Sequence, residues 1–124
     1  MTEVPKCEVV LDAARNLIRM RYNGHICAAE MRPYADEVRG LLPRLRRGFT
    51  VLTDLSGLDS MELDCAAELT RVMDTFKAKG VGSVVRIVPD PSKDIGFNIL
   101  SIIHYRRGVR VATCQTAEEA ERML

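Results

Sequence analysis

Hydroxyl and carboxylate side chains that could do chemistry gather just beyond a hydrophobic stretch that is typical of a central β-strand. Together with one more that follows the next hydrophobic stretch, they are Asp54, Ser56, Asp59, Ser60, Glu62, Asp64 and Ser92. A serine can accept a phosphoryl group, and converging carboxylates can hold Mg²⁺. Open α/β sheets usually bind ligands at the carboxyl ends of their strands. We therefore predict that these residues form a partner-binding site at one edge of the sheet.

The sequence gives little support for a metal site or for catalysis. Acidic residues near a helix start already have a structural explanation, because they complement the positive end of the helix dipole. His25 and His104 lie far apart and lack partners at the spacing of zinc ligands. We therefore predict no catalytic residue, no metal ligand and no cofactor, and we do not expect an enzyme.

Composition and charge narrow the class of protein. Of the 124 residues, 47% are hydrophobic and 28% are charged, as in an ordinary soluble domain. The net charge of +1 and the 5% aromatic content argue against nucleic-acid binding, which relies on basic and stacking side chains. No apolar run approaches the roughly 18 residues that a membrane span needs. Residues 1–6 lack the hydrophobic stretch of a signal peptide, so we expect a cytoplasmic protein.

The cysteines also fit a reducing compartment. They stand singly along the chain, at Cys7, Cys27, Cys65 and Cys114, without a Cys-x-x-Cys pair. Single cysteines in such a compartment usually pack as small hydrophobic residues. We expect all four to be structural.

Alternating strand-like and helix-like segments position the polar residues. Hydrophobic periodicity predicts strands at residues 7–11, 17–23, 49–55, 81–88 and 109–114, and helices at residues 31–45, 63–79, 91–108 and from 117 onward. The short polar turn between the first two strands predicts antiparallel pairing. Thr116 and Glu119 form the capping box of the last helix. The order ββαβαβαβα predicts one α/β domain over residues 1–124, with a mixed, mostly parallel sheet and an N-terminal antiparallel β-hairpin.

The element order and one stretch of sequence resemble the STAS family, the sulphate-transporter and anti-sigma-factor-antagonist domains. The local match is Val-Leu-Thr-Asp-Leu-Ser-Gly-Leu-Asp-Ser-Met at residues 51–61, which resembles the family's central strand and the loop that follows it. The sequence Gln-Thr-Ala-Glu-Glu-Ala at residues 115–120 resembles the family's last strand-to-helix turn. The resemblance implies a STAS-like fold and a regulatory protein partner, such as an anti-sigma-factor-like kinase.

The chain departs from this family at the residue that a kinase would modify. Anti-sigma-factor antagonists carry a serine or threonine at the start of the second helix, and an ungapped match places Asp64 there, or Leu63 if the register slips by one. Our hypothesis is that Asp64 holds the domain permanently in a charged state resembling the phosphorylated one. The alternative is that Glu62 and Asp64 only complement the helix dipole, at about 0.3–1 kcal/mol each. If a kinase acts on this chain after all, Ser60 is the best remaining phosphoacceptor.

The predicted third helix is apolar around most of its circumference. Its apolar residues are Ile95, Phe97, Ile99, Leu100, Ile102, Ile103 and Tyr105, more than one stripe facing a sheet requires. Phe97, Ile99 and Ile103 could cover a homodimer or partner interface, or an apolar ligand such as a lipid. Burial between neighbouring helices is the plain structural alternative.

Taken together, the residues and the resemblance predict a non-catalytic regulatory protein-interaction module. Its docking surface is expected on a loop from Asp54 to Asp64 and on the start of the second helix, with no phosphorylation at the usual serine position. A small apolar ligand or lipid-binding domain of STAS-like fold is the alternative.

Overall fold

The sheet and its helices follow the predicted order closely. The computed structural model describes residues 5–90 and 108–124. Its elements are β1 (Cys7–Asp12), β2 (Leu17–Ile26), α1 (Ala28–Leu41), the short 3₁₀ helix η1 (Leu42–Arg44), β3 (Thr50–Met61), α2 (Cys65–Lys79), β4 (Ser83–Ile87), β5 (Arg110–Cys114) and α4 (Ala117–Met123). The predicted third helix falls outside the described residues.

The strands form one mixed sheet in the order β1-β2-β3-β4-β5. β1 pairs with β2 antiparallel at the sheet edge, and the other neighbours pair in parallel. The turn between β1 and β2 is tight, and Asn16 adopts a positive φ of 53° there, a conformation that asparagine tolerates. The predicted α/β class, the mixed sheet and the N-terminal hairpin are therefore confirmed.

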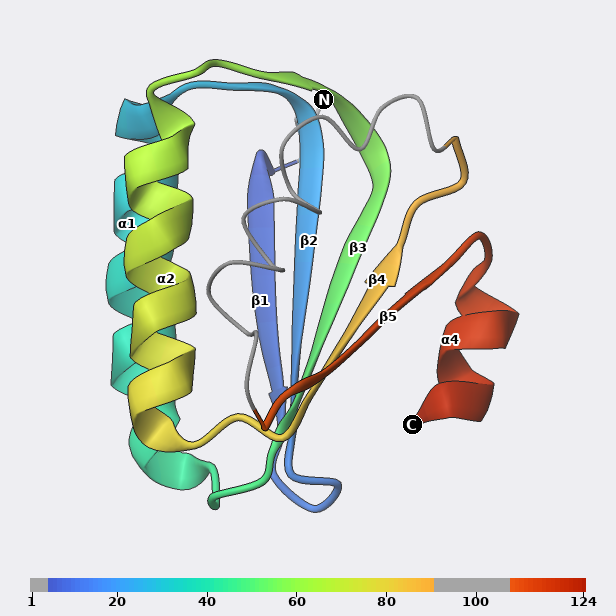
Figure 1. The fold of residues 1–124 in the computed structure, drawn as a ribbon. Helices are drawn as coiled ribbons and strands as arrows, with labels where there is room; N and C mark the ends of the chain where they lie inside the picture. The colour runs from blue at the N-terminus through green and yellow to red at the C-terminus, as the bar shows by residue number, and fades with distance from the viewer. Residues whose placement is uncertain (1–4, 91–107) are drawn as a thin grey trace.

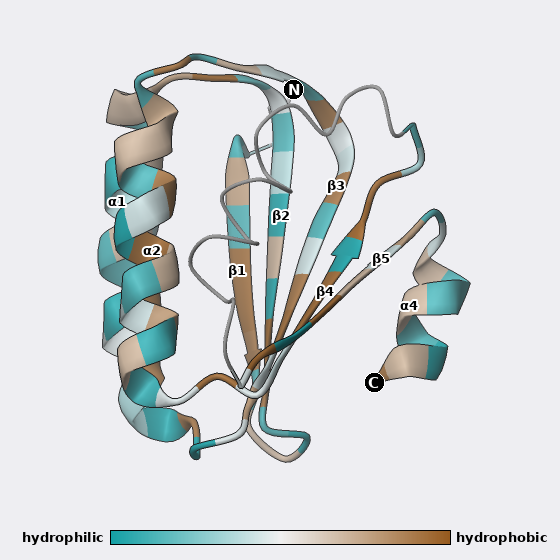
Figure 2. Cartoon of the chain, viewed as in Figure 1, coloured by the Kyte–Doolittle hydropathy of each residue, from teal (hydrophilic) through white to brown (hydrophobic). Residues whose placement is uncertain are grey.

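Helices cover both faces of the sheet (Figure 1), as its alternating side chains require. α1 and α2 lie side by side on one face, where Met31, Val38 and Leu69 pack in the same cluster as Ile18 and Val51. α4 lies on the other face, over a smaller cluster of Leu17, Leu52, Val85, Ile87, Cys114 and Ala120. α1 and α2 alternate between hydrophilic and hydrophobic residues (Figure 2), as helices with one buried face do.

The end of α2 fixes how the chain enters β4. Gly80 ends the helix in the left-handed conformation, at φ 98°, which favours glycine over every other residue. Gly82 then passes so close to Gly48 that a Cβ would lie 2.8 Å from the carbonyl oxygen of Gly48. Beside this crossing, the buried rings of Phe49 and Phe76 meet edge to face with centroids 5.9 Å apart.

Several predicted boundaries are wrong in informative ways. β2 runs on to Ile26 and β3 runs on to Met61, so most of the predicted loop from Asp54 to Asp64 is strand. α1 begins at Ala28, three residues before the first residue of its predicted apolar stripe, and α2 begins at Cys65 rather than at about residue 63. Pro43 falls in the 3₁₀ helix that follows α1, because proline lacks the backbone N–H that would continue the α-helix.

Candidate partner-binding site

The extended ends of β2 and β3 meet the starts of α1 and α2 at one edge of the domain (Figure 1). The strands stay paired to their ends, where Ile26 lies opposite Met61. The backbone amide of Glu62 then donates to the carbonyl of Ile26 at 2.9 Å. We call the surface of residues 25–28 and 59–65 the rim. Backbone hydrogen bonds also join Cys65 to Glu62 and Ala66 to Leu63, so the turn between β3 and α2 is hydrogen-bonded on both sides.

Asp64 occupies the middle of the rim and joins the two helices. Its side chain is exposed and gives no cap hydrogen bond to α2, although Asp64 is the N-cap residue of that helix. Instead, its Oδ1 accepts a hydrogen bond from the backbone amide of Ala28, the first residue of α1, at 3.4 Å. The carboxylate therefore supports the neighbouring helix rather than its own, and its charge remains at the surface.

Replacing Asp64 with alanine is expected to lower the free energy of unfolding by about 0.5–1 kcal/mol, because the α1 amide loses its acceptor and its nearby negative charge. Urea denaturation of the purified variant measures this change. Asp59→Ala is the matched control, since Asp59 is an exposed carboxylate of the same rim. An equal loss in both variants would contradict a specific role for Asp64 in holding α1.

Leu63 is the most exposed large apolar side chain among the described residues, at 95%. It lies between Glu62 and Asp64, and all three side chains are exposed. Exposed leucines are not rare singly, but this one projects fully from a backbone that two helices and two strands hold. The rim therefore presents one apolar side chain flanked by two carboxylates.

Ser60 lies beside His25 because the two residues are direct cross-strand partners in the β2–β3 ladder. His25 Nδ1 and Ser60 Oγ are 2.5 Å apart, and His25 Nε2 lies 4.0 Å from Glu62 Oε1. The imidazole can therefore accept the Ser60 proton. The carboxylate stands beyond hydrogen-bond distance, and His25 is 57% exposed, so the array lacks the oriented, enclosed geometry of a catalytic triad.

The first turn of α1 carries a second capping carboxylate. Cys27 is the N-cap residue, and its backbone amide donates to Glu30 Oε1 at 3.0 Å. Hydrogen bonding from Cys27 lowers the pKa of Glu30. Glu30 therefore keeps its negative charge over the whole neutral range and adds to the acidic character of this edge of the domain.

Asp54 belongs to a different surface, on the face of the sheet that carries α4, and Ser56 is hydrogen-bonded to it. Asp54 Oδ2 lies 3.2 Å from Arg21 Nη2, and Asp54 Oδ1 accepts from the amide and hydroxyl of Ser56 at 2.9 and 2.5 Å. Arg19 pairs nearby with Glu121 at 2.8 Å, and a cavity of about 300 Å³ opens between these charges. The structure thus separates Asp54 and Ser56 from the predicted site residues at the rim.

The remaining predicted site residues are placed as follows. Asp59, Ser60, Glu62 and Asp64 all lie on the rim and are exposed. Ser92, Phe97, Ile99 and Ile103 lie outside the described residues.

A buried carboxylate behind the rim escaped the sequence analysis. Glu68, in the first turns of α2, is 4% exposed. Its Oε1 accepts a hydrogen bond from Arg32 Nε of α1 at 3.3 Å, and Arg71 Nη1 lies 3.8 Å from its Oε2. A glutamate in the first turn of a helix usually faces solvent. Glu68 is buried because α1 packs against α2, and the sequence alone does not predict that packing.

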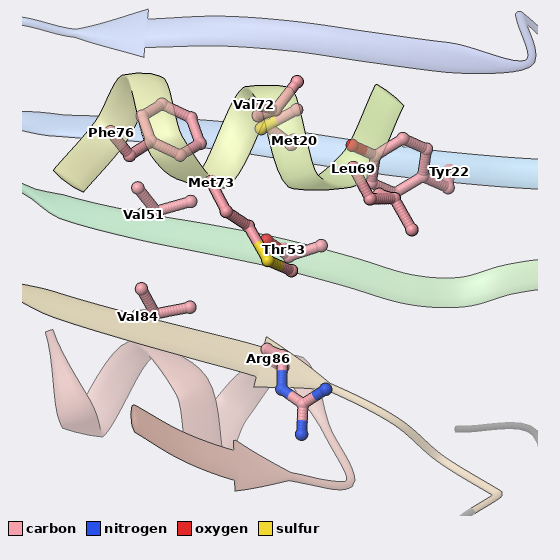
Figure 3. Close-up of a pocket in the computed structure, with 10 residues that line it drawn as sticks. All are labelled: Met20, Tyr22, Val51, Thr53, Leu69, Val72, Met73, Phe76, Val84 and Arg86. Atoms are coloured by element: carbon pink, nitrogen blue, oxygen red, sulfur yellow. The ribbon is translucent and has the colours of Figure 1, made fainter. Parts of the chain in front are cut away.

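The sheet face under α2 holds no room for a lipid among the described residues. Met20, Thr53, Phe76 and Arg86 contribute to the lining of a cavity of about 30 Å³ (Figure 3). That volume suits roughly one or two water molecules, whereas ligand pockets measure about 300–1,000 Å³. The apolar ligand was expected beneath the predicted third helix, which lies outside the described residues.

Two cysteine thiols near the rim are held in their neutral form. Desolvation by burial raises the pKa of Cys7 from 9.0 to about 12 and that of Cys65 from 9.0 to about 11. Both residues are buried, at 2% and 0% exposure, as the sequence analysis predicts for Cys7 and Cys65. Cys27 differs, because its exposure is intermediate.

The raised pKa values predict that the domain loses stability in alkaline solution. Both thiols ionise near pH 9 when unfolded and stay protonated when folded, so stability is complete below pH 9 and falls above it. The unfolded chain then binds fewer protons, and the loss is about 2.7 kcal/mol per pH unit for two thiols. Urea denaturation between pH 8 and pH 10.5 measures it. Cys65→Ala is expected to reduce the slope of the free energy of unfolding against pH by the contribution of one thiol. An unchanged slope would contradict the prediction.

Among residues 5–90 and 108–124, no three His, Cys, Asp or Glu side chains gather closely enough to hold a metal ion. In the same part of the chain, no helix is long and apolar enough to cross a membrane.

Comparison with known proteins supports the fold. No protein-family model and no curated protein matches the sequence. Solved structures do match: SpoIIAA, an anti-sigma factor antagonist in its unphosphorylated form, superposes with a TM-score of 0.65 and 12% identity over 94% of this chain and 96% of its own. The chain has the STAS-like fold.

Two further structures resemble this STAS-like domain over nearly their full length. A protein from Shewanella loihica, described as having a SpoIIAA-like fold, gives a TM-score of 0.69 at 12% identity, over 100% of this chain and 98% of its own. An anti-sigma factor antagonist from Mycobacterium paratuberculosis gives 0.54 at 12% identity, over 99% and 97%. At this identity the likeness establishes the fold of the STAS-like domain, and its activity has to be argued from its own residues.

Proposed function

We propose that this domain is a non-catalytic, cytoplasmic regulatory module that docks a protein partner through the rim. The observation that carries the proposal is Leu63, exposed at 95% between the carboxylates of Glu62 and Asp64. The Leu63 carbonyl already accepts a hydrogen bond from the Ala66 amide, so a partner that covers this leucine has mainly its side chain to order. The complementary partner surface is an apolar pocket bordered by lysine or arginine.

The likeness to anti-sigma factor antagonists supports a regulatory partner of the anti-sigma-factor kind, such as a kinase. Solved structures of SpoIIAA show it in an unphosphorylated and a phosphorylated form. Here Asp64 carries a fixed carboxylate that is exposed and is supported by the α1 amide. We propose that this charge keeps the rim in one state, without the usual phosphorylation. A homodimer remains part of the proposal, to be tested by light scattering of the purified chain.

Site-specific photo-crosslinking tests the docking surface. A photoreactive amino acid replaces Leu63 in one variant and Val10, which is 57% exposed on β1, in the control variant. We expect a discrete protein adduct in the source cells from position 63 and none from position 10. Competition with excess unlabelled domain should remove the adduct. Absence of an adduct at position 63, or the same adduct at both positions, would contradict the proposal.

A second candidate function is regulation by phosphorylation of Ser60. The distance of 2.5 Å between Ser60 Oγ and His25 Nδ1 favours it, because the imidazole can take the hydroxyl proton as the oxygen attacks a phosphate donor. Ser56 is the matched control, since its hydroxyl donates to Asp54 instead. Phosphopeptide mapping of the domain isolated from its source cells should locate phosphate on Ser60 and not on Ser56. Phosphate at neither serine would exclude this candidate.

A further inference from the structure

Cys27 and Cys65 are brought together at the starts of α1 and α2. The carbonyl oxygen of Ile26, directly before Cys27, accepts a hydrogen bond from Cys65 Sγ at 3.4 Å. On the other side of Cys27, the Ala28 amide donates to Asp64 Oδ1 at 3.4 Å. Residues 26–28 and 64–65 therefore lie against each other, and each segment contains one cysteine.

The two thiols differ in access in the way that an oxidant-sensitive pair requires. Cys27 is partly exposed, whereas Cys65 is fully buried beneath the rim. Burial raises the pKa of Cys65 to about 11, so Cys65 stays protonated at neutral pH and Cys27 meets a soluble oxidant first. Exposed cysteines placed next to a resolving cysteine are the usual arrangement of thiol sensors.

We propose that Cys27 and Cys65 are a modification site that forms a disulfide with a low-molecular-weight disulfide such as oxidised glutathione. The Cys27 thiolate attacks one glutathione sulfur, which forms a mixed disulfide and releases one glutathione thiolate. Cys65 then loses its proton to water and attacks the Cys27 sulfur, which releases the second glutathione. The protein gives up two electrons and two protons in this exchange, and glutathione disulfide takes up both.

The bond would join the first residue of α2 to the N-cap residue of α1. It would therefore cross-link the two helix starts that carry the rim, directly beside Asp64. Formation of the bond needs only the isolated domain, so its test is independent of any partner and of the proposed docking function.

Mass spectrometry of the isolated domain tests the proposal. Reduced protein is incubated with oxidised glutathione, free thiols are alkylated, and the digest is mapped. We expect a linked peptide pair containing Cys27 and Cys65, with Cys7 and Cys114 alkylated, and full reversal by dithiothreitol. Cys114→Ser, a thiol on the opposite face of the sheet, should leave the linked pair unchanged.

Cys65→Ala supplies the decisive comparison, because it should stop the reaction at the glutathione adduct of Cys27. The proposal is overturned if wild-type protein also stops at that adduct, if Cys65 links to Cys7 instead, or if all four cysteines remain free after oxidation. Circular dichroism of the Cys65→Ala variant confirms that it is folded. Cys27→Ser removes the attacking thiol, so neither the glutathione adduct nor the linked pair should form in that variant, because Cys65 is buried.

Discussion

Replacing Leu63 with aspartate is expected to weaken partner binding at least tenfold while leaving the fold intact. The wild-type side chain is 95% exposed in the free domain, so the substitution removes no internal contact. Covering a leucine side chain contributes about 1.5–3 kcal/mol, and every 1.4 kcal/mol corresponds to about a tenfold change in affinity. The added carboxylate would also have to lose water in the apolar pocket proposed for the partner.

The measurement is a titration of the protein that photo-crosslinking identifies at position 63. Val10→Asp is the matched control, because Val10 is also an exposed aliphatic residue but lies on the edge strand β1. Its affinity should match that of wild type. Equal affinities of Leu63→Asp and wild type for the partner would show that Leu63 does not lie in the interface.

Replacing Phe76 with alanine is expected to lower the free energy of unfolding by about 3–5 kcal/mol. The Phe76 ring is 2% exposed, packs against Phe49, and lines the small cavity beneath α2. Truncation would enlarge that cavity and remove an edge-to-face aromatic contact, and both changes cost stability. Guanidinium denaturation of the purified variant measures the loss.

Lys77→Gln, on the next residue of the same helix, is the control for Phe76→Ala. Lys77 is exposed in the last turn of α2, so its substitution should cost less than about 1 kcal/mol. A Phe76→Ala loss within that range would mean that α2 does not cover the sheet as described.

Much of the fold follows from the sequence because its signals are local. Thr116 is the N-cap residue of the last helix, as predicted, and its Oγ1 accepts from the Glu119 amide at 3.1 Å. Gly80 ends α2 where predicted, since its left-handed conformation suits glycine. The five strands and their mostly parallel pairing are also recovered, because long hydrophobic stretches alternate with helical periodicity.

The site was harder to predict because its geometry depends on pairing between distant segments. Polar residues and Gly57 gave the end of β3 the composition of a loop, yet pairing with β2 keeps it extended. That register places His25 beside Ser60, and it leaves Asp54 beside Arg21 on the face of the sheet that carries α4. The exposure of Leu63 and the bond from Ala28 to Asp64 follow from the same tertiary arrangement, which no local pattern records.

Nuclear magnetic resonance mapping of the bound partner tests the central claim most directly. The isotope-labelled domain is titrated with the unlabelled protein captured at position 63, and backbone amide shifts are followed. We predict that the largest changes fall on residues 25–28 and 59–67, around Leu63 and Asp64. Changes confined to α4, β1 and the groove beside Arg19, with the rim unaffected, would contradict the proposal that partners dock where α1 and α2 begin.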